Sequence, residues 1–417
     1  MNDGSDAGNE KDSRASLRNI LHVFPEGNPH HNTRFIDFLT GLGDSLENVE
    51  QSFAAIGFLG SPELQIQNGV YVGQYSVFRS VIETVKPDVI LFHGMFDNYY
   101  WQFLLENPNW GKKSVWVVWG GDLYNDILES SQSPRSFLKS LLFRIAKHLP
   151  FWHKAFVYFY ERVMWRLKWP DSSITMIWKA FSLKRMGCVC AAMPQEQSLI
   201  KATYSTEIPM RELRYPLVLD GNKGTCDSCA PNDKSDVTVL LGNSGAPSNR
   251  HIEALEWLHS FKDEERLKII IPLGYGGNDE YVRNVEEAGR SLFGDRAQIL
   301  KETVSQKEYC SMLESVDALV FNHVRQQGMF NVIYCLKNGV KIFLRDDCPT
   351  FEWLGEKGGH IENTRSIPDL DFDAFSRPLD DDEQSVNNRL YEEMFSLASC
   401  QKAWAQFLQN PWKSRDS

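Results

Sequence analysis

The sequence lacks an excess of basic residues, and this restricts what the protein can bind. Lys and Arg total 44 against 55 Asp and Glu, which gives a net charge of −11 over 417 residues. A nucleic-acid partner requires a basic face that neutralises phosphates, so the charge balance argues against that class. The hydrophobic content of 42% and the charged content of 24% are typical of a folded globular protein.

The sequence also lacks a secretory signal and a cysteine framework. Residues 1–16 are polar and acidic, so we expect a disordered leader there rather than a targeting segment. Of the eight cysteines, Cys226 and Cys229 form a lone CxxC pair, which is weak evidence for zinc. We interpret the pair as a reduced feature of a linker in a cytoplasmic protein.

Short apolar runs alternate with helical patterns, which is typical of an α/β protein. In the first half, strands are predicted in the runs that start at Asn19, Ala54, Asp88, Ser114 and Gly187. In the second half, strands are predicted from Asp236, Leu267, Asp317 and Val340, with helices at 250–261, 280–292, 305–315 and 329–337. The chain is also too long for one ordinary core.

This order predicts two doubly wound, Rossmann-like domains that face a cleft. A stretch near Gly221 has no hydrophobic periodicity and marks the boundary. The expected divisions are a leader at 1–16, a first domain at 17–220, a linker at 221–235, a second domain at 236–380 and a helical segment at 381–417. Ligands of such sheets bind beyond the carboxyl ends of strands, so the loops after strands are the candidate sites.

Two loops of the second domain are rich in glycine. The first is "GNSGAPSNRHIEAL", in which Ser248 or Asn249 is expected to cap the following helix, and the second is "GYGGNDEY". Backbone N–H groups at such corners suit a phosphate or a sugar hydroxyl, whereas a tight turn without function is the alternative. The candidate donor-binding residues here are Gly242, Asn243, Ser244, Gly245, Gly274 and Tyr275.

The loop "VRQQG" lies between a predicted strand and a predicted helix. Arg325 would lie near the helix N-terminus, where the macrodipole and free N–H groups favour an anion. A guanidinium there can form two hydrogen bonds with a phosphate, and Gln326 and Gln327 add neutral partners for sugar hydroxyls. With Gly328 these residues predict a diphosphate site, although a surface arginine on a loop is the alternative.

The loops of the first domain contain candidate catalytic residues. His31, His93 and Asp122 each follow a predicted strand and could act as a general base or stabilise charge. A structural histidine or aspartate is the commoner case for each of them alone. Asp369 and Asp371 form a literal DxD in an acidic run, which we interpret as a solvated surface. With Arg325 available to neutralise a diphosphate, we expect no metal ion and no cofactor.

Residues 133–186 differ in charge from the rest of the chain. They carry eleven Lys and Arg against two acidic residues, with many aromatic side chains between them. No apolar run in the segment reaches the ~20 residues that a spanning helix needs. We expect interfacial helices on an anionic membrane, with a nucleic-acid arm or a partner-binding hairpin as alternatives. The expected membrane-contacting residues are Arg144, Lys147, Trp152, Trp165, Arg166 and Trp169.

Taken in order, the motifs resemble a bacterial glycosyltransferase family. They are "HVFPEGNPHHN", "FHGMFD", "WGGDLY", "GCVCAAMPQE", "GNSGAPSNRHIEAL", "IIIPLGYGGNDEYV" and "RQQGMFNVIYCLKNGV", which span most of residues 19–344. The family transfers 4-acetamido-4,6-dideoxy-D-galactose from its dTDP form to an undecaprenyl-diphosphate-linked saccharide in enterobacterial common antigen assembly.

The resemblance implies a GT-B fold of two Rossmann-like domains without a metal requirement. The second domain would bind the dTDP-sugar, and the first would present the polyprenyl-linked acceptor at the cytoplasmic face of the bacterial inner membrane. Two other functions fit the same two-domain pattern. One is a nucleotide-sugar epimerase or hydrolase, which would have no use for residues 133–186. The other is a non-catalytic nucleotide-sugar-binding protein, in which His31, His93 and Asp122 would tolerate alanine.

Overall fold

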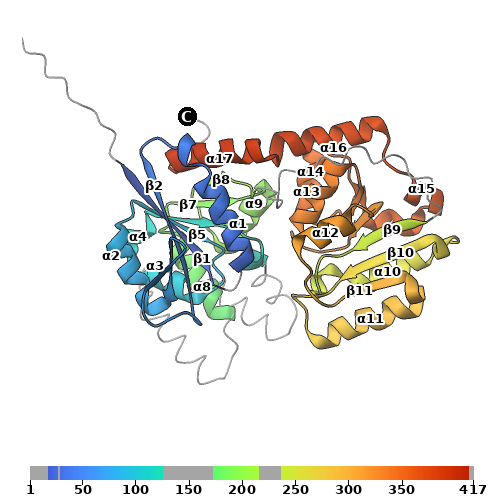
Figure 1. The fold of residues 1–417 in the computed structure, drawn as a ribbon, viewed down its shortest axis with the longest axis horizontal. Helices are drawn as coiled ribbons and strands as arrows, with labels where there is room; N and C mark the ends of the chain where they lie inside the picture. The colour runs from blue at the N-terminus through green and yellow to red at the C-terminus, as the bar shows by residue number, and fades with distance from the viewer. Residues whose placement is uncertain (1–16, 27–28, 125–171, 216–235, 413–417) are drawn as a thin grey trace, which may run out of the picture.

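The computed structural model describes residues 17–26, 29–124, 172–215 and 236–412. Within them the chain forms two α/β domains, each built on its own sheet of mostly parallel strands (Figure 1). Helices cover both faces of each sheet, as the near-continuous burial of the central strands requires. The predicted fold class of two Rossmann-like sheets is therefore confirmed.

The first sheet has eight strands in the order β3-β4-β2-β1-β5-β6-β7-β8. The strands are β1 Arg18–Pro25, β2 Val49–Gly57, β3 Gln65–Gln67, β4 Val70–Gln74, β5 Val89–His93, β6 Ser114–Val117, β7 Cys188–Ala191 and β8 Met210–Glu212. All neighbours are parallel except β3 and β4. The helices are α1 Pro29–Thr40, α2 Phe78–Val85, α3 Asn98–Glu106, α4 Pro108–Gly111, α8 Ser172–Leu183 and α9 Pro194–Tyr204.

The two faces of the first sheet pack into separate core clusters because successive strand residues point to opposite faces. Leu21 and Val23 of β1 pack with residues of α2, α3, α8 and α9. Ile20 and Phe24 pack on the other face with Phe35 of α1.

The second sheet has six parallel strands in the order β11-β10-β9-β12-β13-β14. The strands are β9 Val237–Leu241, β10 Leu267–Pro272, β11 Ala297–Leu300, β12 Ala318–Phe321, β13 Lys341–Leu344 and β14 Glu362–Asn363. The helices that follow them are α10 His251–His259, α11 Asp279–Phe293, α12 Gln306–Leu313, α13 Met329–Asn338 and α14 Pro349–Glu356. Gly339 ends α13 in the left-handed region, as the Asn338-Gly339 pair predicts.

The nine predicted strands are all present, and the strands that sequence reasoning missed lie at or beside sheet edges. β3 and β8 close the first sheet, β11 and β14 close the second, and β4 lies next to β3. β3 is exposed throughout, and β14 has two half-buried residues. Short edge strands bury little apolar surface, so they leave no apolar run in the sequence.

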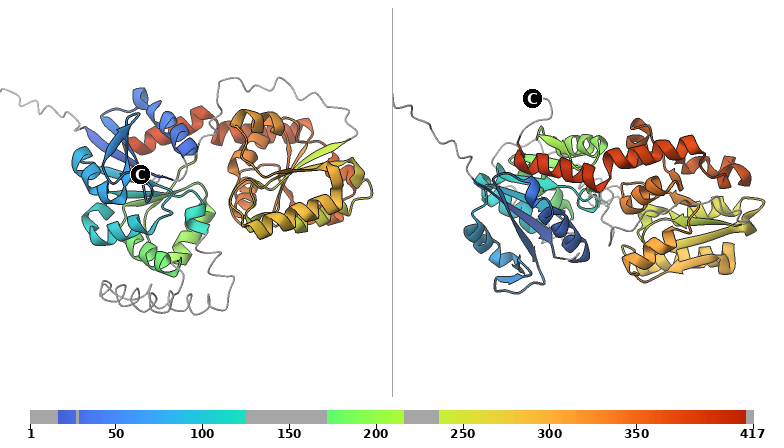
Figure 2. Two further views of the ribbon diagram at one scale, coloured as in Figure 1. Left: turned by 60° about the horizontal axis from the view of Figure 1, so that its bottom comes forward. Right: turned by 45° about the horizontal axis from the view of Figure 1, so that its top comes forward.

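The chain returns to the first domain after completing the second. Helices α15 Phe372–Ser376 and α16 Asp381–Met394 belong to the second domain, where α16 packs on α13. Helix α17 Leu397–Gln409 then runs along the first domain (Figures 1 and 2). Trp404 of α17 is fully buried against Phe35 and Phe38, and its indole N–H donates to the Arg214 carbonyl at 2.8 Å.

The two domains touch through loops at the carboxyl ends of their strands. Gly120 follows β6 and has no side chain, which leaves room for the Gln326 amide from the loop after β12. Met193 follows β7 and is buried in a core cluster of the second domain. Gln195 of α9 donates to Glu356 of α14 at 3.1 Å. The loops expected to carry the chemistry therefore face one another.

Candidate functional site

The glycine-rich loops after β9 and β10 lie against each other. The Gly245 N–H donates to the Tyr275 carbonyl at 2.8 Å, and the Asn243 amide donates to the Tyr275 hydroxyl at 3.1 Å. Gly242 has a φ of +69°, which a residue with a side chain rarely adopts. Gly274 also needs to be glycine, because a Cβ there would lie 2.9 Å from the Glu302 backbone carbon.

The loop after β12 joins the same unit through Gln327. Its amide N–H₂ donates to Asn243 Oδ1 at 3.0 Å, and its Oε1 accepts from the Ser248 hydroxyl at 2.8 Å. Gln327, Asn243 and Ser244 are buried. The sequence-predicted donor residues from three separate loops are thus brought together by hydrogen bonds between the loops.

The prediction that Ser248 or Asn249 caps α10 is wrong. Asn249 is buried and donates to the carbonyls of Ser244 at 2.9 Å and Ala246 at 3.0 Å, so its side chain folds the loop instead. The N-cap of α10 is Arg250, whose φ is +52° and whose side chain does not cap the helix. A non-glycine residue in this region stores strain, which is commonly found at functional loops.

Arg250 is a further candidate residue of these loops that sequence reasoning missed. It ends a glycine-rich β–α loop immediately before a helix, which is the signal that singled out Arg325. Its guanidinium is half exposed, and its Nε lies 2.8 Å from Glu253 Oε2.

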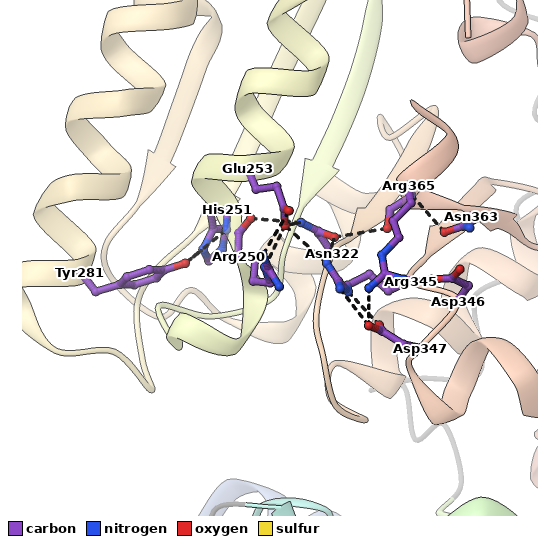
Figure 3. Close-up of polar contacts among 11 residues, drawn as sticks. Arg250, His251, Glu253, Tyr281, Asn322, Arg345, Asp346, Asp347, Asn363 and Arg365 are labelled. Carbon is purple, nitrogen blue, oxygen red and sulfur yellow. Dashed lines mark hydrogen bonds and ion pairs between the residues drawn. The ribbon is translucent and has the colours of Figure 1, made fainter. Parts of the chain in front are cut away.

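A polar network lies behind these loops and fixes their relative positions (Figure 3). Glu253 Oε2 accepts from the Asn322 amide at 2.7 Å, and Asn322 Oδ1 accepts from Arg345 at 3.2 Å. Arg345 is buried and forms two hydrogen bonds of 2.9 Å with Asp347, which raise the pKa of the guanidinium. The network connects the segments that follow β9, β12 and β13. It is a rigid support because nearly every polar group in it has a partner.

The N-terminus of α13 lies at the centre of the three loops. Its N-cap is Gly328, with a φ of +63° and no side chain to cap the first N–H groups. A Cβ at Gly328 would lie 3.0 Å from the Asn243 Cβ, so only glycine allows this approach. Arg325 is half buried, and desolvation lowers the pKa of its guanidinium while Tyr124 and Tyr275 act in the opposite direction. The Tyr275 side chain is 57% exposed beside them.

His93 of the first domain is buried and faces the protein interior. Its Nε2 lies 3.0 Å from His22 Nδ1, its Nδ1 lies 3.3 Å from the Tyr215 hydroxyl, and its ring stacks on Phe24. Burial lowers the pKa of His93 well below its usual range and that of His22 to about 3, so both rings are neutral. With an exposed fraction of 1%, His93 is placed where direct contact with a ligand is not favoured, and its catalytic role stays a prediction.

Asp122 is also buried and holds two loops together. Its carboxylate accepts from the Met95 N–H at 2.9 Å, the Trp116 indole at 2.6 Å and the Trp119 N–H at 2.9 Å. Burial raises the pKa of Asp122, and Lys179 and these donors act against the rise. The geometry therefore gives Asp122 a positioning role, between the loop after β5 and the loop after β6.

His31 is the candidate catalytic residue that remains exposed. It lies in the first turn of α1, with its ring centroid 4.4 Å from that of Trp119 and 5.7 Å from that of Tyr215. Desolvation by these neighbours and repulsion from Arg34 lower the pKa of His31 to about 4. The imidazole is therefore neutral at physiological pH.

Glu196 is a second residue that sequence reasoning missed. It lies in the first turn of α9, after β7, and its side chain is buried near Tyr124 and Asp122. Burial raises the pKa of Glu196 to about 8, and the Asp122 charge adds to the rise. A carboxyl group at a helix start after a strand was the available signal, but its burial depends on residues distant in sequence.

Several predicted features fall on other parts of the chain. Asp371 accepts the Ala374 N–H and caps α15. In the part of the chain that the structure describes, no group of three or more His, Cys, Asp or Glu could hold a metal ion. The Cys226–Cys229 pair and the membrane-contacting residues lie outside the described residues, namely Arg144, Lys147, Trp152, Trp165, Arg166 and Trp169.

Solved structures with the same arrangement of two sheets include enzymes of sugar metabolism. Sucrose-phosphate synthase from Thermosynechococcus elongatus superposes with a TM-score of 0.64 at 10% identity, covering 95% of this chain and 99% of that one. A structure described as trehalose-6-phosphate from E. coli bound with UDP-2-fluoro glucose gives a TM-score of 0.59 at 9% identity, covering 94% of this chain and 99% of that one. A putative UDP-N-acetylglucosamine 2-epimerase from Listeria monocytogenes gives a TM-score of 0.51 at 12% identity, covering 95% of this chain and 98% of that one. At these identities the likeness shows the fold alone, which is the GT-B arrangement.

The family is shown by a match along the sequence itself. The model described as 4-alpha-L-fucosyltransferase, glycosyl transferase group 56, matches residues 17–149 and 127–358. The two spans overlap and together contain every loop of the candidate site. This confirms the resemblance that the motifs indicate and the expected activity class. The chain belongs to glycosyltransferase group 56, the 4-alpha-L-fucosyltransferase family, and is a hexosyltransferase.

Proposed function

We propose that the protein transfers a 4-acetamido-4,6-dideoxyhexose from a dTDP-linked donor to an undecaprenyl-diphosphate-linked saccharide. The product would be a bacterial surface polysaccharide, either enterobacterial common antigen or an O-antigen-like glycan. The family description names a fucosyl group, which like the proposed sugar is a 6-deoxyhexose. The motifs from "HVFPEGNPHHN" to "RQQG" support the acetamido sugar and the dTDP carrier.

The observation that carries this proposal is the hydrogen-bonded unit around the N-terminus of α13. Gln327 ties the loops after β9 and β12 together, and Arg325 lies beside helix N–H groups that Gly328 leaves uncapped. Positive charge and free N–H groups at one point favour a diphosphate.

The acceptor would bind against the first domain. His31 is exposed next to Trp119, one residue from the point where Gln326 reaches Gly120. It is our candidate for the group that accepts the acceptor proton. His93 and Asp122 would act through the residues they position. We expect no metal requirement, because Arg325 and the helix terminus already supply positive charge for the leaving diphosphate.

Membrane association would bring the enzyme to its lipid-linked acceptor. Among the described residues, no helix is long and apolar enough to cross a membrane. We propose peripheral binding through residues 133–186 at the cytoplasmic face of the inner membrane. Replacing the Lys and Arg residues of this segment with Gln should release the protein from anionic vesicles. Continued sedimentation with such vesicles at low salt would contradict the proposal.

The donor site is tested by nucleotide binding. The melting temperature is measured with dTDP, UDP, GDP and ADP, with and without magnesium, and a magnesium-independent rise with dTDP is expected. A rise with UDP or GDP instead would keep the transferase and change the donor. No rise with any nucleotide would contradict the donor site. Incubation of the donor without acceptor distinguishes the alternative activities, because an epimerase would return an altered nucleotide sugar.

Arg325→Ala should weaken dTDP binding by about 10- to 150-fold, because it removes a charge-assisted contact. The measurement is calorimetric titration of dTDP. Arg290→Ala is the matched control, since it removes the same charge from an exposed position on α11 of the same domain. Equal affinities for dTDP in both variants would remove Arg325 from the site.

A further inference from the structure

A group of aromatic side chains on the first domain lies outside the set of predicted donor-binding residues. Phe96 follows β5, Trp119 follows β6, and His31 lies in α1 after β1. The rings of Phe96 and Trp119 lie 6.3 Å apart between centroids, and Trp119 and His31 lie 4.4 Å apart. We call these three side chains the aromatic platform. β1, β5 and β6 are neighbours in the sheet, so the platform spans adjacent strand ends.

The backbone is built to hold these rings. Gly94 has a φ of +66°, and a Cβ there would lie 2.7 Å from Phe96 Cε2 and 2.9 Å from Trp119 Cδ2. The rings therefore pack directly on a bare backbone. The Asp122 carboxylate accepts N–H groups from Met95 and Trp119, which fixes the two loops relative to each other. Even so, Phe96 remains 43% exposed.

The polar edge of Trp119 is already occupied. Its indole N–H donates to the Tyr215 hydroxyl. Because indole is only a donor, the Tyr215 oxygen is the acceptor and its own O–H can donate to His93 Nδ1. If His93 Nδ1 accepts from Tyr215, the ring proton of the neutral His93 is on Nε2, and this N–H donates to His22 Nδ1. The reverse order would leave the Tyr215 proton without an acceptor. Trp119 is therefore anchored at its edge, and it has no N–H left to offer a ligand.

The platform lies beside the loops after β9, β10 and β12, which hold the predicted donor-binding residues and which we call the donor loops. Gly120 follows Trp119 directly, and Gln326 of the donor loop reaches it. A glycosyltransferase must hold the acceptor sugar next to the donor sugar, because the bond forms between them. Trp119 is half-buried and Phe96 is 43% exposed, so part of this apolar surface is open beside the donor loops.

We propose that the face of Trp119, with Phe96 beside it, binds the acceptor sugar by stacking against the apolar C–H face of a pyranose ring. The electron-rich ring face attracts the partial positive charge of those C–H groups. Tyr215 is a positioning residue, which acts by holding the Trp119 edge. This inference rests on the proposed function, in which the first domain receives a saccharide acceptor.

The test separates acceptor binding from donor binding. Initial rates are measured against a short-chain prenyl-diphosphate disaccharide as acceptor and the dTDP-sugar as donor, and dTDP affinity is measured by calorimetry. Trp119→Ala should raise the acceptor KM about tenfold or more while leaving dTDP affinity unchanged. Trp119→Phe should restore most of the loss, because it keeps a ring face. Phe58→Ala is the matched control, since Phe58 is a 79% exposed aromatic residue of the same domain.

Tyr215→Phe tests the positioning role without removing the platform. It should raise the acceptor KM several-fold and leave dTDP affinity unchanged. An unchanged acceptor KM in Trp119→Ala would overturn the proposed stacking of the acceptor sugar and leave the proposed function standing. A parallel loss of dTDP affinity would assign Trp119 to the nucleotide base instead and would also overturn it. Wild-type protein that binds dTDP but transfers nothing to the saccharide would contradict the proposed acceptor, and the platform with it.

Discussion

At the scale of single residues, burial keeps several ionisable groups near the facing strand ends uncharged. His22 and His93 are neutral inside the first domain, and Glu196 is protonated at neutral pH. These groups affect stability in opposite directions. As the pH falls below about 6.5, the unfolded chain binds protons on histidines that stay neutral when folded, so stability is lost. Glu196 has the reverse effect, because its raised pKa makes the folded protein lose stability as the pH rises.

Glu196→Gln should stabilise the protein more at pH 8 than at pH 5. The pKa of Glu196 is about 8 in the folded protein against 4.5 normally, so the folded state holds a proton that the unfolded chain releases. Wild-type stability therefore falls as the pH rises through this interval, by up to about 1.4 kcal/mol per pH unit, and glutamine removes the dependence. Urea unfolding at the two pH values measures this. Glu314→Gln at an exposed position is the control, and an equal change at both pH values in Glu196→Gln would contradict the assignment.

The sequence predicted which loops hold the candidate residues but not the environment of each side chain. His31 and Asp122 follow strands, and His93 is the last residue of β5, as the apolar runs predict. Which of them is buried depends on residues far away in sequence. Tyr215 lies 122 residues from His93, and Lys179 lies 57 residues from Asp122. Local pattern contains no information about such contacts, so the roles of the three residues could not be separated from sequence.

At the scale of elements, the interior strands of both sheets were predictable from the sequence, and the strands at or beside the sheet edges were not. A strand buried on both faces reads as a continuous apolar run, as β5 and β12 do. The donor loops were recognised because glycine and arginine at strand ends have a local signature. The hydrogen bonds that join these loops were not predicted, because Gln327 and Asn243 lie 84 residues apart in the sequence. A helical segment at 381–417 was expected, but the same limitation hid that α17 within it packs on the first domain.

Trp404→Ala should destabilise the first domain by about 3–5 kcal/mol, because it leaves a cavity in a core shared with Phe35 and Phe38. It also leaves the Arg214 carbonyl without its donor. Urea unfolding followed by far-UV circular dichroism would show the shift in midpoint. Leu397→Ala lies on the same helix at a position 46% exposed and should change stability little. Similar effects for the two substitutions would mean that α17 does not contribute to this core.

At the scale of the whole molecule, one of the contacts between the two domains lies where Gly120 has no side chain. Gly120 and Gln326 meet where the platform side of the first domain touches the donor loops. Gly120→Ala should lower kcat several-fold, because the new Cβ would lie 2.3 Å from Gln326 Oε1 and would displace the side chain of this predicted donor-binding residue. Steady-state rates at saturating donor and acceptor measure this effect.

Gly69→Ala is the matched control for Gly120→Ala. Gly69 has a φ of +79° and Gly120 a φ of +81°, so alanine is strained equally at both positions, but a Cβ at Gly69 meets nothing within 4 Å. The two variants should lose similar stability, and kcat should fall in Gly120→Ala alone. Adding Gln326→Gly to Gly120→Ala should recover part of the rate. Equal kcat values in the two single variants would show that this contact does not limit catalysis.

The return of α17 to the first domain has a consequence for how the protein is made. Trp404 and Phe407 complete a core whose other members lie mostly before residue 216. A ribosome therefore synthesises the first domain and then the whole second sheet before the first core can close. Until residues 397–409 emerge, the apolar side chains that Trp404 and Phe407 cover stay exposed to water. This face of the first domain is completed only by a helix translated after the second sheet, since Trp404 lies 190 residues after its partner Arg214.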